Sequence, residues 1–428
     1  MTRKPFLGLG RPRLGCLVLA TEGQEAIQEI PLPNRVTFFL EHHHDSDEEF
    51  DLKVGDEVRT GQKLKLMQDD KGYAISSVTG TIAGISQYKG YLGKTYTAIA
   101  INTAEEEHWD EESKEAWEKP NAESALEFLD FLPGDPDLAS LLDSEKSLDT
   151  IIIKGIDSDL LVTTNQLIVK TEFENLKAGI EYLKEITGAG KFLIAVPPEL
   201  TSQAETTGAE VKVIEPTYPN TLPKVITERV LGRVVPAGKR CEEVGAGFIS
   251  AEAVVSLAKA ITHHQVPVNK IVTVIDKNHK SVHVMARIGT PVEDILGVLG
   301  IETQHGDGLV LGGPMTGRAI YSEDTPVMPD TDAIMVQDRS QVVMNSNSHC
   351  FNCGECVRAC PAKIPINMLV RVLENGLYEE AVKEYDLLSC IECGLCSYVC
   401  PARIPVFHFI MLGKYEFDRI ERMEESNA

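Results

Sequence analysis

Short runs in which apolar and polar residues alternate follow one another between residues 50 and 102, in "DLKVGDEVRTGQKLKLMQ" and in "AISSVTGTIAGISQYKGYLGKTYTAIAI". Gly-Asp, Thr-Gly and Lys-Gly pairs separate these runs. Alternation of this kind is typical of half-buried strands, and such pairs are typical of the turns that join them. The pattern therefore predicts a small β-sandwich or barrel in this part of the chain.

The periodicity changes after residue 150. Ile151 to Ile153 read as a short apolar strand, an amphipathic helix ends near Gly188, and a second strand runs from Phe192 to Val196. This succession predicts an α/β layer with parallel pairing. The "TGAGK" between helix and strand has the reverse order of a phosphate-binding P-loop, so its glycines are predicted to cap the helix.

Residues 268 to 320 form a third unit, with two predicted strands, a short helix after Thr290-Pro291 and a further strand at Leu309 to Leu311. This order predicts a small β-grasp-like domain. From about residue 345 the chain becomes rich in cysteine and helical, and "INMLVRVLENGLYEEAVKEYDLLS" carries apolar residues at helical spacing that indicate packing. The predicted fold class is therefore multidomain α/β and α+β.

Length and composition restrict the number of domains and the class of protein. With 428 residues the chain has room for roughly three or four domains. No run approaches the length of a membrane span, and the arginines and glycines of "FLGLGRPRLGCLVLATEG" make a poor signal peptide. We therefore expect a cytoplasmic protein with no direct membrane insertion, although it is expected to sit on a membrane partner.

The charge is strongly acidic, with a formal net charge of -24. This argues against nucleic acid as a partner, because phosphate binding needs a clustered basic surface. Between Ala104 and Asp149 there are 16 Asp and Glu residues against 3 Lys. We interpret this segment as a linker with an exposed helix and a solvated acidic face, in preference to a docking surface.

A metal site at His42 to His44 is disfavoured, because adjacent residues of an extended chain point to opposite faces.

Eight of the ten cysteines fall between residues 350 and 400, in "CFNCGECVRACPAKIP" and "CIECGLCSYVCPARIP". Each passage has the form C-x2-C-x2-C-x3-C-P, in which three closely spaced thiolates surround one cubane and the fourth cysteine is predicted at the start of a helix. In two-cluster ferredoxins the fourth cysteine ligates the other cluster. That rule assigns one [4Fe-4S] cluster to Cys350, Cys353, Cys356 and Cys400, and a second to Cys390, Cys393, Cys396 and Cys360.

Zinc is the competing interpretation, but it usually takes two separated pairs of cysteines. Cys16 and Cys241 are interpreted as isolated, buried or incidental thiols.

The order of parts resembles the RnfC family, the peripheral subunits of ion-translocating Rnf electron-transport complexes. The resemblance extends from about residue 50 to 415, and its individual matches include "VGDEVRTGQ", "YPNTLPKVITERVLGRVVP", "RIGTPVEDIL" and "LGGPMTG". It implies five regions: a barrel-sandwich hybrid domain at 1–103, an acidic linker with a helix at 104–148, an α/β domain like the flavin subunit of complex I at 149–265, a β-grasp (SLBB-like) domain at 266–340, and a helical dicluster ferredoxin domain at 341–428.

Family members are understood to exchange electrons between NAD(H) and FMN, and the flavin phosphate is held by a glycine-rich loop. The corresponding stretch here is "FLDFLPGDPDLASLL", with Gly134 as its only glycine. The next flavin-site element is "KGIDSDL", where Lys154, Gly155, Asp157 and Asp159 stand in place of Asn, Gly and two Glu. A third element is replaced by "VGAGFISAEAV". The flavin site is thus expected to be degenerate and FMN to be absent.

Three functions remain open at this point. The favoured hypothesis is a non-catalytic subunit that relays electrons through two clusters and docks in a ferredoxin-oxidising complex on the cytoplasmic face of the membrane. The alternative is a divergent FMN-containing NADH:ferredoxin oxidoreductase subunit, and the third is a soluble reductase like the RnfC-related cobalamin reductases. If an acidic ferredoxin docks on this acidic chain, a local basic patch is predicted at Arg358, Lys363 and Arg403.

Overall fold

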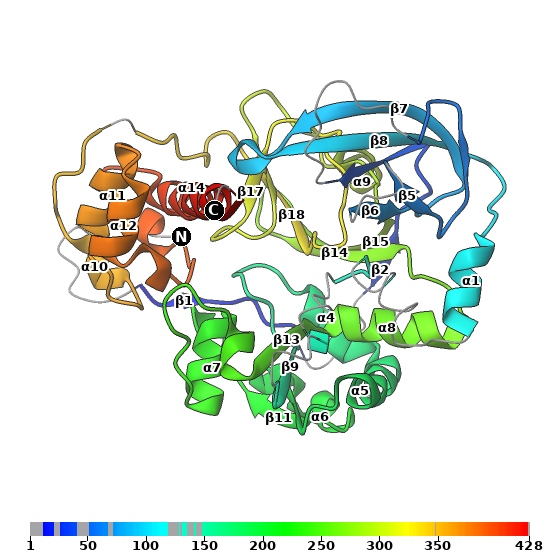
Figure 1. Cartoon of the computed structure of the whole chain (residues 1–428), viewed down its shortest axis with the longest axis horizontal. Coiled ribbons are helices and arrows are strands. Elements are labelled where there is room, and N and C mark those ends of the chain that lie inside the picture. The colour runs from blue at the N-terminus through cyan, green and yellow to red at the C-terminus, as the bar shows by residue number, and fades with distance from the viewer. Residues whose placement is uncertain are drawn as a thin grey trace.

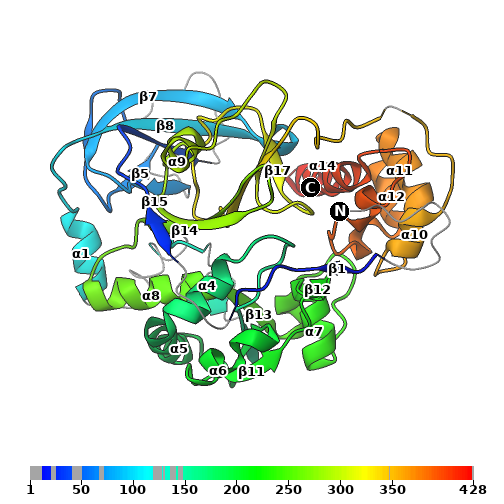
Figure 2. The same ribbon diagram turned by 180° about the vertical axis from the view of Figure 1, so that it is seen from behind.

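The computed structural model describes residues 12–20, 26–40, 51–66, 72–118, 128, 131–134, 141–142, 148–346 and 348–426. The histidines His42 to His44 lie outside the described residues. Figure 1 shows a β-rich region formed by β7 and β8, an α/β layer around β9 and β13, and a helical region with α10, α11 and α12 at one end. The C-terminal helix α14 (Val406–Ser426) runs inward from that helical region, and Figure 2 shows it from behind.

The strands between residues 35 and 103 form an antiparallel unit with its own core. The four-stranded sheet contains β3 (Arg35–Leu40), β8 (Thr95–Thr103), β7 (Gly80–Lys89) and β4 (Glu57–Val58), in that spatial order, and β5 (Lys63–Lys65) pairs with β6 (Tyr73–Ile75). Alternate residues of β3, namely Val36, Phe38 and Leu40, are buried in this core. The predicted small β-sandwich or barrel is confirmed.

Two short N-terminal strands pair outside this unit. β1 (Leu14–Gly15) is antiparallel to β12 (Thr217–Tyr218), and β2 (Ile27–Glu29) is parallel to β15 (Ser281–Arg287). These pairings join the N-terminal residues to two other sheets, and the bounds of the predicted domain 1–103 stay a prediction. Strands of two or three residues carry too little alternation for the sequence to indicate their partners.

A parallel sheet forms the centre of the α/β layer. Its strands, in spatial order, are β11 (Glu210–Val213), β10 (Lys191–Val196), β9 (Thr150–Lys154) and β13 (Ala246–Ser250). The helices that accompany it are α4 (Thr164–Thr171), α5 (Phe173–Thr187), α6 (Thr201–Glu205), α7 (Pro223–Leu231) and α8 (Ala251–His263). Ile151 and Ile153 pack in the core with α5 and α8, whereas Ile152 packs with Ile226 of α7 on the other face. The predicted parallel pairing is confirmed, as is the helix cap at Gly188, which has a φ of 62°.

The acidic segment packs more closely than the predicted linker with an exposed helix. α1 (Glu111–Glu118) exposes Glu111 and Glu112, but Trp117 is fully buried and its carbonyl lies 2.9 Å from Nδ1 of His264. Further apolar residues of this segment, Phe128, Leu132 and Leu141, are buried in the same core as α5 and α8. Acids make up much of this segment, and its buried apolar residues are widely spaced. The sequence therefore contains no periodic pattern from which this packing could be predicted.

A six-stranded mixed sheet forms the third unit. Its strands, in spatial order, are β17 (Arg318–Ile320), β16 (Gly308–Leu311), β18 (Ala333–Gln337), β14 (Asn269–Ile275), β15 and β2. The strand at 309–311 and the helix α9 (Val292–Leu299) confirm the sequence prediction. β18 was not predicted, and it occupies the centre of the sheet, parallel to β14 and antiparallel to β16.

Short helices form the cysteine-rich end. They are α10 (Glu355–Ala359), α11 (Ile366–Glu374), α12 (Tyr378–Tyr385) and α13 (Leu395–Tyr398), followed by α14. Leu369, Leu373 and Ala381 are buried together with cluster-motif cysteines, which confirms the predicted packing role of α11 and α12. Among the described residues, no helix is both long and apolar enough to cross a membrane.

Candidate iron-sulfur centre and the adjoining pocket

The structure brings four cysteines from both motifs to one small cavity. Cys350, Cys353, Cys356 and Cys400 all line it, and all four are half-buried. Cys400 belongs to the second motif, so the chain reaches across to complete the group. We call this group the first site.

The other four cysteines form the second site: Cys360, Cys390, Cys393 and Cys396. All four are buried. Cys360 comes from the first motif, yet it is close enough to Cys390 and Cys393 to raise the thiol pKa of both, as a smaller contribution than burial. The two groupings support the crossed ligation, which stays a prediction.

The fourth cysteine of each motif lies at the end of a short helix and not at the start of one. Cys360 is the C-cap residue of α10, and Cys400 follows α13. The helices that follow begin only at Ile366 and Val406. Each motif closes its helical turn first, and the Pro that follows the cysteine then turns the chain toward the next helix.

Burial disfavours the thiolate form of one cysteine at the first site, Cys356, and of three at the second, Cys390, Cys393 and Cys396. It raises the pKa of Cys356 to about 12, and the neighbouring Cys353 adds to this. Burial also raises the pKa of Cys393 to about 12 and that of Cys396 well above its usual value. Four converging thiolates therefore need a positively charged group between them, and soft sulfur ligands suit an iron-sulfur core. The residues present fit such a group.

Three contacts that the sequence did not indicate hold the second site in place. Tyr218 Oη donates a 2.6 Å hydrogen bond to the carbonyl of Cys393, and Tyr218 is 2% exposed. Lys414 Nζ donates to the carbonyl of Cys390 at 2.9 Å and pairs with Glu392 at 2.6 Å. A Cβ at Gly394 would lie 2.3 Å from the carbonyl oxygen of Met315, so this loop is pressed against the "GGPMTG" segment.

The predicted basic residues are all exposed, but they are not equivalent. Arg358 donates to the carbonyl of Cys353 at 3.2 Å and pairs with Glu355, so it lies beside the first site. Arg403 follows Ala402, which lines the first-site cavity. No described contact places Lys363 at that cavity.

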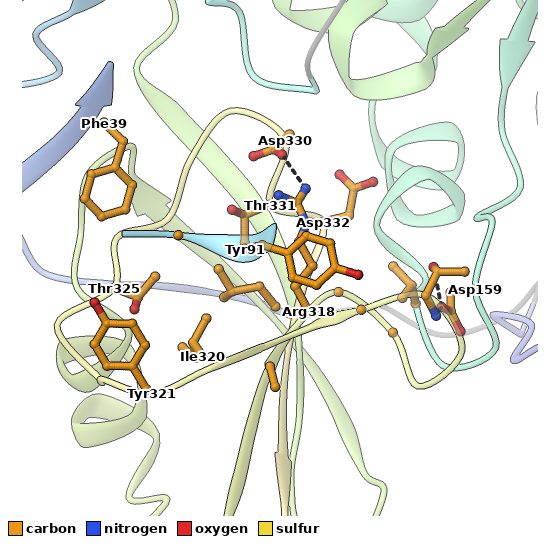
Figure 3. A pocket seen from close by; sticks show the side chains of 18 of the residues that line it. Phe39, Tyr91, Asp159, Arg318, Ile320, Tyr321, Thr325, Asp330, Thr331 and Asp332 are labelled. Atoms are coloured by element: carbon orange, nitrogen blue, oxygen red, sulfur yellow. Dashed lines mark hydrogen bonds and ion pairs between the residues drawn. The ribbon is translucent and has the colours of Figure 1, made fainter. Parts of the chain in front are cut away.

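A pocket of about 420 Å³ lies where the barrel, the α/β layer and the six-stranded sheet meet. Figure 3 shows Asp159 at one end, Phe39 and Tyr321 at the other, and Tyr91 with Arg318 between them. Arg318 forms an ion pair with Asp330 at 3.2 Å. The pocket therefore contains two of the residues assigned to the degenerate flavin site, Asp157 and Asp159.

Both of these acids are occupied by hydrogen bonds from the protein itself. Asp157 accepts from the backbone and side-chain nitrogens of Asn165 at 2.8 and 3.1 Å, and from Gln166. Asp159 accepts from the backbone nitrogens of Leu160, Met315 and Thr316 and from the Thr316 hydroxyl, at 2.7 to 3.1 Å. Burial raises the pKa of both carboxyl groups, and these hydrogen bonds oppose the rise.

The remaining flavin-site positions have packing roles. A Cβ at Gly155 would lie 2.7 Å from Val196, so this glycine allows a close approach between β9 and β10. Lys154 is the last residue of β9, half-buried and in register with Ser250.

Gly134 lies over the start of α8, where a Cβ would be 2.5 Å from the nitrogen of Ala253. Ser250 Oγ accepts from that nitrogen at 3.0 Å, and Asn165 Oδ1 accepts from the nitrogen of Ala251 at 2.9 Å. Free backbone N–H groups at a helix start are what an anion would bind. Because side chains of this chain accept from two of these N–H groups and Gly134 lies against the second, the start of α8 is a poor fit for a flavin phosphate.

The two cysteines outside the motifs differ from each other. Cys241 is buried beside Ile226 and Ile152, as an ordinary core thiol. Cys16 is half-buried and packs in the same apolar cluster as Tyr218, Cys393 and Leu395. Burial raises the pKa of Cys16 to about 11. Cys16 is thus near the second site, which its isolated place in the sequence did not indicate.

Two family models match the chain. Residues 342–408 match a 4Fe-4S dicluster domain, and residues 20–106 match the RnfC barrel sandwich hybrid domain. These matches establish the barrel-sandwich unit and the dicluster domain in a mixed α/β protein.

Similar proteins carry related names. The chain is 24% identical over 354 residues to a protein of Yersinia pseudotuberculosis named as part of an ion-translocating oxidoreductase complex, covering 78% of this chain and 50% of that protein. It is 25% identical over 385 residues to a protein of Clostridium ljungdahlii named as part of a proton-translocating ferredoxin:NAD(+) oxidoreductase complex, covering 85% and 84%. The chain spans about half the length of the Yersinia relative. These findings confirm the resemblance to RnfC proteins that the sequence motifs indicated.

Among solved structures, an NAD+-reducing [NiFe]-hydrogenase in the H2-reduced state aligns with a TM-score of 0.45 at 13% identity, covering 70% of this chain and 61% of that one. A similarity at this level does not establish a shared fold or function.

Proposed function

We propose that this chain is an RnfC-like electron-transfer subunit of a membrane-associated, ion-translocating, ferredoxin-oxidising complex, and that it holds two [4Fe-4S] clusters. The observation that carries this proposal is the gathering of eight cysteines into two groups of four within one dicluster domain. The names of the relatives support the place in a complex. When bound, each cluster supplies one-electron exchange.

The ligands in this proposal are Cys350, Cys353, Cys356 and Cys400 at the first site, and Cys390, Cys393, Cys396 and Cys360 at the second. The chain itself supplies burial, hydrogen bonds and charge, which set the potential of a bound cluster. At the second site the Lys414 ammonium and the Tyr218 hydroxyl orient the loop carbonyls. No acid, base or nucleophile is needed, so the chain is proposed not to be catalytic alone.

We also propose that the chain has no NADH or FMN chemistry of its own. The hydrogen bonds that occupy Asp157 and Asp159 support this, as does the covered start of α8. The finer layout is part of the same proposal: residues 149–265 as a flavin-subunit-like α/β domain, 266–340 as an SLBB-like domain and 341–428 as the dicluster domain. The partners would be other subunits of a membrane complex and a ferredoxin, with the chain peripheral on the cytoplasmic face.

Anaerobic reconstitution of the full chain tests the proposal. Iron, sulfide and extractable flavin are assayed, and NADH-driven viologen reduction is measured. We expect about eight irons per chain, without stoichiometric flavin and without NADH-dependent activity. Stoichiometric FMN together with that activity would instead establish the divergent oxidoreductase, and zinc in place of iron would overturn both.

A further inference from the structure

The surroundings of the two cysteine sites differ in exposure. The four cysteines of the first site are half-buried, whereas those of the second are all buried. Phe351, which lines the first-site cavity, is 56% exposed. Figure 1 places α10, which carries Cys356, toward the outer end of the helical region. An outside protein would therefore reach the first site more closely than the second.

The charges of the dicluster domain are separated along the chain. Residues 341–373 contain Arg358, Lys363 and Arg371 against the single acid Glu355. Residues 374–392, which include α12, contain six acids against one lysine. The first site thus lies in a locally basic part of a chain whose net charge is -24.

Three arginines can be placed beside the first site. Arg358 bonds the Cys353 carbonyl, and Arg403 follows the cavity-lining Ala402. Arg371 is exposed one helical turn after Asn367, which lines the cavity and hydrogen-bonds Asn352 at 2.5 Å. Residues four apart on a helix share a face, so Arg371 lies on the same side of α11 as Asn367.

We propose that Phe351, Arg358, Arg371 and Arg403 form the docking face for an acidic iron-sulfur electron carrier, which exchanges electrons with this chain at the first site. The proposal rests on the proposed function, since it requires a cluster at that site. It differs from the patch predicted by sequence in three ways: it includes Phe351 and Arg371, and it does not include Lys363.

Attraction at this face and repulsion elsewhere on the chain both favour an acidic partner here. Exposed aromatic residues and arginines are enriched in protein interfaces, and the first site has both beside it. The acidic remainder of the chain repels an acidic partner, so the field guides that partner to this face and increases its association rate. A basic carrier would be attracted elsewhere on the chain.

The test uses the full chain and a small acidic two-cluster ferredoxin as the probe, under anaerobic conditions. Two quantities are measured at low and high salt: the affinity of the probe for the chain, and the second-order rate at which the reduced probe reduces the chain. The Arg371→Glu/Arg403→Glu variant is expected to lose about tenfold or more in both at low salt, because reversed charges repel the partner. Phe351→Ala is expected to weaken binding with little change in its salt dependence.

Arg422→Glu is the matched control. Arg422 is exposed on α14, 16 residues after Val406 of the first-site cavity and so roughly 24 Å along the helix. It is expected to behave as the unmodified chain does. Equal rates and affinities for the double variant and the unmodified chain would overturn the docking face, as would a preference for a basic carrier.

Reduction by dithionite separates this proposal from the proposed function. If dithionite reduces all variants equally, the clusters are intact and any loss with ferredoxin reports docking. If dithionite reduces none of them because no cluster is present, the proposed function fails, while the affinity measurement still decides whether the face binds the probe.

Discussion

The cysteine-rich end and the pocket beside Asp159 differ in what their polar side chains contact. At the two cysteine sites, thiols from distant motifs converge on one another. At the pocket, the carboxylates of Asp157 and Asp159 accept hydrogen bonds from backbone and side chains of this same chain. Acids that resemble ligands in the sequence can therefore act as structural connectors. Asp159 joins the α/β layer to the "GGPMTG" loop, and Gly394 of the second site packs on that loop.

The largest expected effect follows from removing one crossed ligand. Cys400→Ala should leave a chain with the iron content and spectrum of Cys356→Ala, because both remove a ligand of the first site. Cys360→Ala should match Cys396→Ala in the same way. Each variant should lose up to about four of eight irons. Iron assay and EPR spectroscopy of the reduced proteins check this, and a spectrum of Cys400→Ala that matches Cys396→Ala would show uncrossed ligation.

The second expected effect distinguishes a structural acid from a ligand-binding acid. Asp159→Ala should lower the free energy of unfolding by about 3 kcal/mol, because one buried N–H group, two partly buried N–H groups and one hydroxyl lose their acceptor. Urea unfolding, followed by tryptophan fluorescence and circular dichroism, measures it. Asp418→Ala is the control, since Asp418 is exposed on α14. If Asp159→Ala unfolds like the control, the carboxylate is not a connector.

A matched pair of glycines isolates the contact between the pocket loop and the second site. Gly354 and Gly394 occupy the same place in the two motifs, with φ of 75° and 69°. A Cβ at Gly354 would meet only the end of Arg358, at 3.3 Å, whereas one at Gly394 would lie 2.3 Å from the Met315 oxygen. Both alanine variants carry the backbone strain of about 1 kcal/mol. Gly394→Ala should lose roughly 1–3 kcal/mol more in urea unfolding, and equal losses would contradict the contact.

Sequence reasoning succeeded where the information is local. The spacing of the eight cysteines, the cap at Gly188 and the strands at Ile151 to Ile153 and Leu309 to Leu311 each depend on a short run of residues. It failed for contacts between distant segments: Tyr218 meets Cys393 across 175 positions. The central strand β18 was missed because its place depends on β14 and β16 and not on its own pattern.

Contacts between distant segments were also missed at the two acids in the expected flavin-site positions, Asp157 and Asp159. The replacement of Glu by Asp at 157 and 159 indicated a degenerate site, but the new partners of these acids could not be predicted. Thr316 lies 157 positions from Asp159, and Asn165 bonds Asp157 from the start of α4. A shorter carboxylate fits here because Gly313 approaches it: a Cβ at Gly313 would lie 2.4 Å from the Asp159 carboxyl carbon.

The smallest expected effect is a change in redox potential at only one of the two cysteine sites, caused by a difference in their electrostatics. Lys414 is 15% exposed and bonds the Cys390 carbonyl, so its charge acts on the second site through little water. Lys414→Gln removes that charge and leaves Glu392 without its ion-pair partner, and both changes disfavour the added electron of a reduced cluster. If the interaction is worth about 1 kcal/mol, the second-site potential should fall by roughly 40 mV.

An EPR-monitored redox titration measures both potentials, and the first-site potential should stay nearly constant. Lys383→Gln is the control, because Lys383 pairs with Glu379 on the exposed surface of α12. A shift of both potentials by the same amount would mean that Lys414 acts on the domain as a whole. That result would remove the electrostatic difference between the sites and leave their unequal exposure as the remaining distinction.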